Sequence, residues 1–204
     1  MADSPSVHDR LLVAAGELFY AGGITATGVD SVVRAAGVTK PTLYAHFPSK
    51  AALVTATLER RYRERVAQLE ERVLAVPDPA QRPVEVFGWL GDFYARAGSR
   101  GCGFLNAAAE LTDPGDVART VIEQEKRWLV DLLRRLCSEA GVPAPERLAR
   151  QLLLLVDGVA GHVVVHGPDG AAAAVADATE AAVVLMEHAT NHPERARSGA
   201  EARS

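Results

Sequence analysis

The chain has 204 residues, of which 48% are hydrophobic and 24% charged, enough apolar material for one small and one larger helical or mixed core. Its net charge of −4 and pI near 5.9 exclude the strongly basic composition of a dedicated DNA-binding domain. Two cysteines, Cys102 and Cys137, are too few for a disulfide framework and match no zinc or redox spacing, so we expect reduced thiols and no metal.

The distribution of polar residues predicts a soluble, cytoplasmic protein. The first ten residues are polar and acidic, unlike a secretory signal. The long apolar runs near the carboxyl end are too short to span a bilayer, because four polar side chains interrupt them: Asp157, His162, Asp177 and Glu180. We therefore expect no membrane partner.

The first two predicted helices have clear boundaries. An apolar stripe at helical spacing ends at a glycine pair, and it consists of Val7, Leu11, Ala15, Leu18 and Phe19 before Gly22 and Gly23. We expect the second helix to begin at Thr27, whose hydroxyl can cap it together with Asp30 three residues on. Gly37 ends this helix, because glycine adopts the left-handed conformation without a steric penalty.

The third predicted helix follows after a very short turn. Thr39 is its cap, and Pro41 lies in its first turn, where a missing amide costs nothing. Leu43 and Phe47 are four residues apart and point inward. The outward side chains can bond to phosphate oxygens or base edges, and they are Lys40, Thr42, Tyr44 and His46. The sequence therefore predicts a helix-turn-helix with a DNA-facing second helix.

This segment resembles the DNA-binding domain of TetR/AcrR-family transcriptional regulators, whose helix-turn-helix commonly ends in Gly-Val-Ser-Lys-Gly-Thr-Leu-Tyr-x-x-Phe-x-Ser-Lys. The matching residues are Gly37, Val38, Lys40, Thr42, Leu43, Tyr44, Phe47, Ser49 and Lys50. Thr39 keeps the hydroxyl of a frequent Ser, and Pro41 should stiffen the start of the recognition helix. We predict that the DNA contacts are Thr27, Thr39, Lys40, Pro41, Thr42, Tyr44, His46 and Lys50.

The acidic net charge does not exclude this function, because only the charge at the contact face matters. At that face Lys40 and Lys50 stand without nearby acids, and Arg10 and Arg34 could lie at its margins. The acidic residues fall largely elsewhere.

The remainder of the chain predicts helices only. A long helix runs from Ser49 to the break at Pro77 and Pro79. Further helices are expected over about 83–97, 103–111, 116–140, 144–166 and 171–188. The fold is thus all-α with about nine helices. The resemblance implies a three-helix DNA-binding domain over 1–50 and a ligand-binding and dimerisation domain over 51–192, and the polar, aperiodic residues 193–204 predict a disordered tail. We interpret one charged run on the long helix as a solvated face without a function: Glu59, Arg60, Arg61, Arg63, Glu64, Arg65, Glu70 and Glu71.

The last two predicted helices are apolar almost all round, as a helix buried on more than one side would be. The resemblance implies that they pair with their copies in a second subunit to form a four-helix bundle. Small residues at Gly158, Ala160 and Gly161 would let the backbones approach closely.

The resemblance also implies a small-molecule effector, bound between the long helix and the last helices. The segment Gly101 to Glu110 is similar to a stretch common at the start of the sixth helix in the family. We predict the effector residues Phe93, Phe104, Asn106, Glu110, Trp128, Asp157 and His162. Asp157 interrupts an apolar helix, so its carboxylate must be paired, hydrogen-bonded or protonated, by the protein or by a ligand.

Two other patterns could carry chemistry. Histidines four residues apart, His162 with His166 and His188 with His192, could bind a metal, but no third ligand follows at a suitable spacing. Cys102 lies between two glycines at a helix start, where it could be a reactive thiol or small apolar filler.

We predict a non-enzymatic repressor without a cofactor, which binds near-palindromic double-stranded DNA as a homodimer and is released by the effector. The alternative is a helical small-molecule-binding or Cys102-dependent protein, in which the helix-turn-helix is only a packing unit. Against an enzyme stands the absence of a Gly-x-Ser-x-Gly motif, of phosphate-binding glycine loops and of paired carboxylates with a base in reach.

Overall fold

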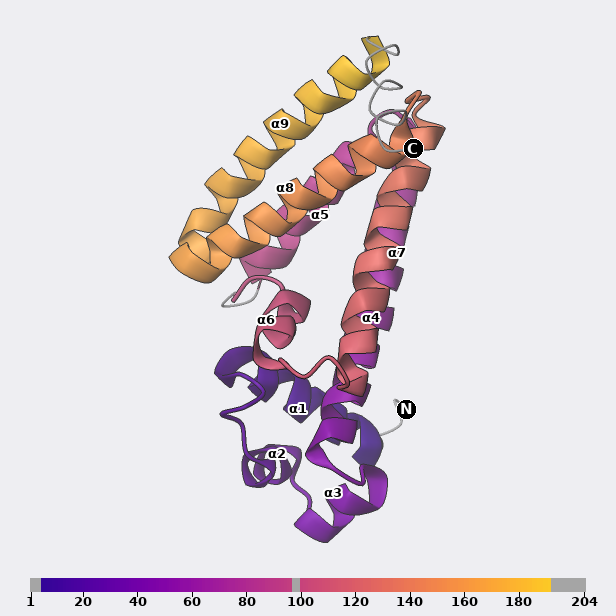
Figure 1. Ribbon diagram of the computed structural model, residues 1–204. Coiled ribbons are helices and arrows are strands. Elements are labelled where there is room, and N and C mark those ends of the chain that lie inside the picture. Colours follow the sequence, from indigo (N-terminus) through magenta and orange to yellow (C-terminus); the bar gives the residue numbers. More distant parts are fainter. Residues whose placement is uncertain (1–4, 97–99, 192–204) are drawn as a thin grey trace. The chain divides into compact units, whose positions relative to one another are not determined.

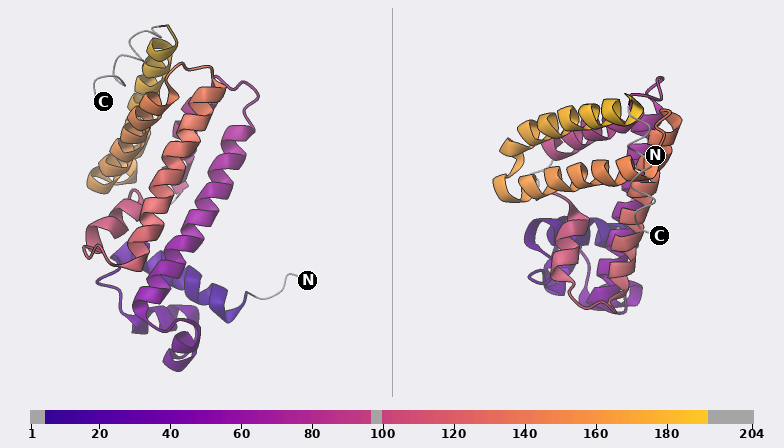
Figure 2. Two further views of the ribbon diagram at one scale, coloured as in Figure 1. Left: turned by 45° about the vertical axis from the view of Figure 1, so that its right-hand side comes forward. Right: turned by 45° about the horizontal axis from the view of Figure 1, so that its top comes forward.

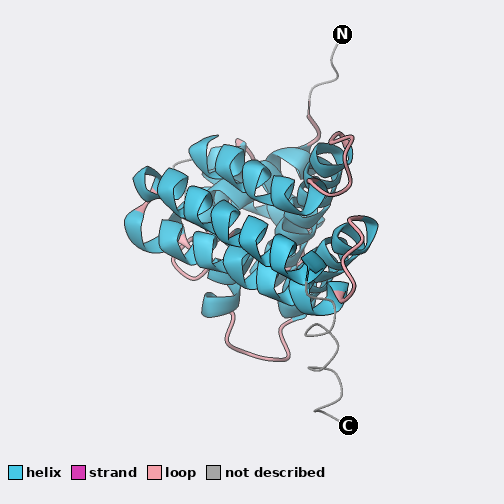
Figure 3. Cartoon of the chain, turned by 90° about the horizontal axis from the view of Figure 1, so that it is seen from above, coloured by secondary structure: helices cyan, strands magenta, loops and turns pink. Residues whose placement is uncertain are grey.

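The computed structural model describes residues 5–96 and 100–191, and within these ranges it contains only helices and loops (Figure 3). The all-α prediction is confirmed. The nine α-helices of the described chain are α1 (Val7–Gly22), α2 (Val29–Ala36), α3 (Lys40–His46), α4 (Lys50–Leu74), α5 (Arg82–Arg96), α6 (Gly103–Glu110), α7 (Val117–Glu139), α8 (Pro145–His166) and α9 (Ala171–Asn191). The predicted tail over 193–204, and also Ala97 and His192, lie outside the described residues.

The chain forms two compact units, and each is described by itself. The first unit runs to Val66 and also includes Gly103–Glu125, so it holds α1 to α3, much of α4, α6 and the start of α7. The second unit consists of Ala67–Cys102 and the chain from Lys126 onward. The helix-turn-helix thus belongs to a compact unit larger than residues 1–50, and the predicted domain boundaries stay predictions.

The core of the first unit forms where the apolar stripes of its helices meet. Helix α1 packs against α2, which in turn contacts α3. Helix α1 ends at Gly22 and is followed by Gly23, whose φ of 88° is accessible to glycine without strain. The buried side chains from these helices and from the start of α4 include Leu11, Leu12, Phe19, Val32, Leu43, Phe47 and Leu53.

In the second unit, α9 packs against both α5 and α8 (Figures 1 and 2). A 3-10 turn, η1 (Pro168–Gly170), connects α8 to α9, so the two helices form a hairpin. Gly101 lies directly against α8: a Cβ at this position would collide with the carbonyl oxygen of Ala160. This close approach to the backbone of α8 explains the glycine at position 101, whereas Gly158 and Gly161 have no neighbour within 4 Å of a Cβ built on them.

The prediction that every apolar run is too short to span a bilayer is wrong for α8, the one described helix that is long and apolar enough to cross a membrane by length and composition. The mean hydropathy of its most apolar window is 1.6, and 39% of that window is buried. Core helices of soluble proteins meet the same criterion, and Asp157 in α8 pairs with Lys126 of α7. This helix is therefore weak evidence for a membrane span.

The interpretation of the charged run on α4 as a solvated face is wrong for part of the run. Arg60 and Glu64 do form an ion pair between consecutive turns, at 2.7 Å. The side chain of Arg65, however, is only 11% exposed and lies 2.9 Å from the completely buried Glu125 of α7. Arg61 lies over the ring of Tyr20, 4.6 Å from its centre. Charge spacing along one helix cannot reveal which side a distant helix covers.

Candidate nucleic-acid interface

The turn between α2 and α3 has the predicted geometry. Gly37 is left-handed, with φ of 64° and ψ of 41°, and the N–H groups of Gly37 and Val38 donate to carbonyls at the end of α2. The hydroxyl of Thr39 accepts the N–H of Thr42 at 3.3 Å and thereby caps α3. Ser49 caps α4 in the same way, accepting the N–H of Ala52 at 3.0 Å.

Helix α3 has one buried and one exposed face, as its spacing predicts. Leu43 and Phe47 are 0% and 4% exposed and anchor the helix in the core of the first unit. The outer face consists of the exposed Lys40, Pro41, Tyr44 and His46 and the half-buried Thr42. The hydroxyl groups of Thr42 and Thr39 are hydrogen-bonded at 2.7 Å. Tyr44 is 44% exposed although it is a large aromatic residue, so its hydroxyl and ring are available to a partner. Because Leu43 and Phe47 fix the buried side of this short helix, its polar side has a defined orientation towards a partner.

The statement that Lys40 and Lys50 stand without nearby acids is wrong for Lys40. Its ammonium lies 3.0 Å from the carboxylate of Asp30 on α2, and the hydrogen bond to Asp30 raises the pKa of Lys40. Lys50 donates instead to the backbone carbonyl of Thr25, at 3.3 Å. The Asp30 contact was missed because it joins two helices across the turn. Each lysine thus has a partner within the protein.

Thr27 does not cap α2, so this part of the prediction is also wrong. The cap residue of α2 is Gly28, which has no side chain to contribute. Thr27 is 8% exposed, and its hydroxyl donates to the carbonyl oxygen of Gly23 at 2.6 Å. The side chain therefore fixes the segment after α1 and does not face solvent.

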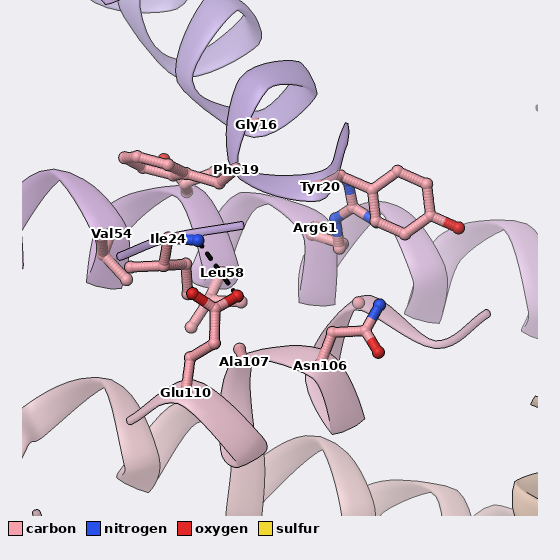
Figure 4. Close-up of a pocket in the computed structure, with 12 residues that line it drawn as sticks. Gly16, Phe19, Tyr20, Ile24, Val54, Leu58, Arg61, Asn106, Ala107 and Glu110 are labelled. Atoms are coloured by element: carbon pink, nitrogen blue, oxygen red, sulfur yellow. Dashed lines mark hydrogen bonds between the residues drawn. The ribbon is translucent and has the colours of Figure 1, made fainter. Parts of the chain in front are cut away.

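A cavity of about 30 Å³ lies within the first unit (Figure 4). It has room for about two water molecules. Its walls come from α1, α4, α6 and the segment after α1: Gly16, Phe19, Tyr20, Ile24, Val54, Thr57, Leu58, Arg61, Gly103, Asn106, Ala107 and Glu110. Two predicted effector residues, Asn106 and Glu110, are thus brought together here. Glu110 accepts backbone N–H groups from Ile24 and Thr25, a contact that no local pattern predicts.

The third predicted effector residue of the first unit, Phe104, is buried, with 1% exposure. The guanidinium of Arg65 lies 6.0 Å from the centre of its ring. This aromatic residue therefore contributes to the core and supports the buried charge pair.

The other four predicted effector residues belong to the second unit. Phe93 stacks on Trp89 with ring centres 5.1 Å apart, and Trp128 is half-buried. Asp157 already has a protein partner, the ammonium of Lys126 at 2.5 Å. The exposed ring of His162 lies 4.3 Å from that of His166. Among the described residues no group of three His, Cys, Asp or Glu side chains could hold a metal ion.

Both cysteines are buried, Cys102 with 3% exposure and Cys137 with none. Burial raises the pKa of the Cys137 thiol to about 12. Since the thiolate is the reactive form, Cys137 is protected twice, by steric exclusion and by protonation. The burial of Cys102 does not favour the alternative of a Cys102-dependent protein.

We expect neither thiol of the native protein to react with an aromatic disulfide reagent at about pH 8. Both should react once a denaturant unfolds the chain, and absorbance of the released thiolate measures this. Cys102→Ser and Cys137→Ser variants identify the thiol responsible for any signal. Rapid native labelling that disappears only in Cys102→Ser would contradict the packing role of Cys102.

A recognition helix that is capped, anchored from below and preceded by a left-handed turn defines a helix-turn-helix DNA-binding protein. Residues 11–57 match the family model described as bacterial regulatory proteins, tetR family. A crystal structure described as a tetR-type transcriptional regulator (sav143) from Streptomyces avermitilis superimposes with a TM-score of 0.77, at 30% identity, covering 91% of this chain and 98% of that one. The chain belongs to the TetR family of transcriptional regulators.

The relatives of this chain include both a transcriptional activator and a transcriptional repressor. The transcriptional activator FasR of Mycolicibacterium smegmatis is 40% identical over 73 residues, which are 36% of this chain and 33% of FasR. The transcriptional repressor ComR of Escherichia coli is 34% identical over 144 residues, covering 65% of this chain and 66% of ComR.

Proposed function

We propose that this regulator is a cytoplasmic repressor that binds a near-palindromic operator as a homodimer and is released by a small-molecule effector. The observation that carries the proposal is the exposed polar face of α3 on a buried anchor of Leu43 and Phe47. A homodimer would place two such helices one DNA turn or a multiple apart, roughly 34–36 Å for a single turn, in successive major grooves.

We assign different roles to the residues of this face. Tyr44 and Lys50 are phosphate contacts, whereas Lys40 and Thr42 read base edges. The remaining exposed positions, Thr39, Pro41 and His46, flank these four. Thr27 is left out of the interface, because its side chain is buried and its hydroxyl donates to the carbonyl oxygen of Gly23.

The apolar surface of α8 and α9 supports the homodimer. Leu154, Val165 and Val184 are 71%, 75% and 57% exposed in the single chain, which is unusual for side chains of this size. Gly158 and Gly161 lie on the same helix as the first two and have open space above them. A second copy of this face would cover the apolar surface and use the space over the glycines.

For the effector we keep two groups of candidates, one in each unit. Phe104, Asn106 and Glu110 belong to the first, and the second consists of Phe93, Trp128, Asp157 and His162. Helices α4 and α7 each contribute to both units and connect them covalently. An effector that prefers a state with the wrong spacing of recognition helices would shift the population away from DNA.

A gel-shift assay with the DNA upstream of the regulator's own gene tests the proposal directly. Retarded DNA that is competed by the same sequence, and not by an unrelated duplex, would support it. A chain that folds and retards neither would overturn it and favour a helical binding protein with a purely structural helix-turn-helix.

Changes at the phosphate contacts should weaken binding to all sequences alike. We expect Lys50→Ala to reduce the slope of log K against log salt by about 0.9 per subunit, because one counterion release is lost. Tyr44→Phe should lower affinity without changing sequence preference. Fluorescence anisotropy over a salt series measures both effects, and unchanged affinity in both variants would contradict the proposed docking.

Changes at the base readers should instead alter sequence preference. Lys40→Ala and Thr42→Ala are expected to cost about 1–3 kcal/mol at particular operator positions and little elsewhere. Binding to a set of operators with single base-pair changes measures this. A uniform loss over all positions would reassign these residues to the DNA backbone.

A further inference from the structure

Glu110, at the end of α6, holds the segment that follows α1. One carboxylate oxygen accepts the backbone N–H of Ile24 at 3.1 Å (Figure 4), and the other accepts the backbone N–H of Thr25 at 2.8 Å. Ile24 is 8% exposed, so its N–H has little access to water and depends on this acceptor. One side chain thus satisfies two consecutive backbone donors of a segment 85 residues earlier in the sequence.

The neighbouring residues leave space for the Glu110 carboxylate and fix the end of its helix. Gly23 has a φ of 88°, and a Cβ at this position would lie 3.0 Å and 3.2 Å from the two oxygens of Glu110. Only glycine therefore fits both the backbone conformation and the space. The end of α6 is itself fixed, because Arg119 of α7 donates to the carbonyl oxygens of Ala108 and Leu111.

A negative charge at the carboxyl end of a helix is disfavoured by the helix dipole. Two charge-assisted hydrogen bonds offset this cost at Glu110, which gives a reason for a carboxylate at this position.

The segment held by Glu110 also carries a DNA contact of the proposed interface. The N–H of Thr25 donates to Glu110, and the carbonyl oxygen of the same residue accepts the ammonium of Lys50 at 3.3 Å. The hydroxyl of Thr27 ties the segment back to Gly23. A lysine side chain has four rotatable bonds, so one fixed acceptor restricts the region that its charge explores, while the other two N–H groups stay available to a phosphate.

We propose that Glu110 is a positioning residue for DNA binding, which fixes the 23–25 segment and, through the carbonyl of Thr25, places Lys50 for its phosphate contact. This inference rests on the proposed function, because it requires that Lys50 contacts DNA. It assigns to Glu110 a role in the DNA interface that does not require a bound effector.

A double-mutant cycle in the full chain tests the inference. The variants are Lys50→Ala, Glu110→Gln and their combination, and operator affinity is measured over a salt series. Glu110→Gln keeps the size of the side chain but points an NH₂ group at one of the two backbone donors. We expect each single change to reduce the salt slope by about 0.9 per subunit and the combination to behave like Lys50→Ala alone. Glu17→Gln, at an exposed position of α1, removes the same charge and should leave the slope unchanged.

Amide hydrogen exchange supplies a second measurement that does not depend on DNA. Exchange at Ile24 and Thr25 should accelerate in Glu110→Gln at a temperature where circular dichroism shows full helicity, and the combined variant should match it. If Glu110→Gln does not fold, Glu110→Asp, which keeps the charge and withdraws it by one methylene, takes its place.

Three results would overturn the inference. Additive losses of affinity from Lys50→Ala and Glu110→Gln would mean that the two residues act independently, and the proposed interface would stand. Unchanged exchange at Ile24 and Thr25 in Glu110→Gln would remove the physical link. Parent-like binding by Lys50→Ala would remove that lysine from the interface and contradict the proposed docking as well.

Discussion

Arg65→Met should lower the free energy of unfolding by about 3–5 kcal/mol. The change leaves the carboxylate of Glu125 completely buried without its cation, which now lies at 2.9 Å. An uncompensated charge in the interior cannot recover its hydration from water. Urea unfolding followed by circular dichroism measures the loss. Arg60→Met is the matched control, because Arg60 forms an exposed ion pair and should cost about 1 kcal/mol or less.

Replacing both partners, Arg65→Met with Glu125→Leu, should restore most of the stability or increase it by about 1–4 kcal/mol. The geometry of the pair is imperfect, since the Nε of Arg65 and both carboxylate oxygens of Glu125 lack a hydrogen bond of good geometry. The desolvation of the two charges is therefore poorly compensated. A double variant that is less stable than both single variants would show that the pair is well satisfied, for instance by buried water, and would contradict this account.

Gly161→Leu should separate the subunits and lower operator affinity by about 10²- to 10⁴-fold, because a monomer contacts only one half-site. Nothing in the single chain lies within 4 Å of a Cβ at this position, so a larger side chain meets no obstacle within its own subunit. Helix propensity even favours Leu over Gly by about 1 kcal/mol. Sedimentation velocity measures the association state, and far-ultraviolet circular dichroism should show unchanged helicity.

Gln124→Leu is the control for this variant, because it adds the same side chain at an exposed helical position of α7 and should leave the protein dimeric. A Gly161→Leu protein that still sediments as a dimer would place the interface elsewhere. The exposed surface at Leu154 and Val165 would then need another partner.

Local patterns predicted the helix-turn-helix almost residue by residue. Gly37, Thr39 and Ser49 act within a few residues of themselves, through backbone conformation and capping, so the sequence alone contains the information. The same holds for the alternation of buried Leu43 with exposed Tyr44. The bounds of the later helices also agree with the predicted ranges to within a few residues.

The candidate site needed the structure wherever a side chain finds its partner in a distant helix. Arg65 was predicted to lie on a solvated face, but it pairs with Glu125 of α7. Thr27 was predicted to cap α2, but its hydroxyl donates to the carbonyl oxygen of Gly23. Glu110 was expected to bind an effector, and its contact with Thr25 spans 85 residues of sequence. Periodicity describes which face of a helix is apolar and not which element packs on it.

The burial of both native thiols makes the unmodified chain a ready background for spectroscopic probes. A cysteine introduced at the exposed Ala45 of α3 would be the single labelling position if Cys102 and Cys137 do not react with the thiol reagent. Spin labels attached there in two copies would report the separation of the recognition helices as a distribution in solution. Screening candidate metabolites against that distribution would identify an effector by its effect on spacing, without knowledge of the operator.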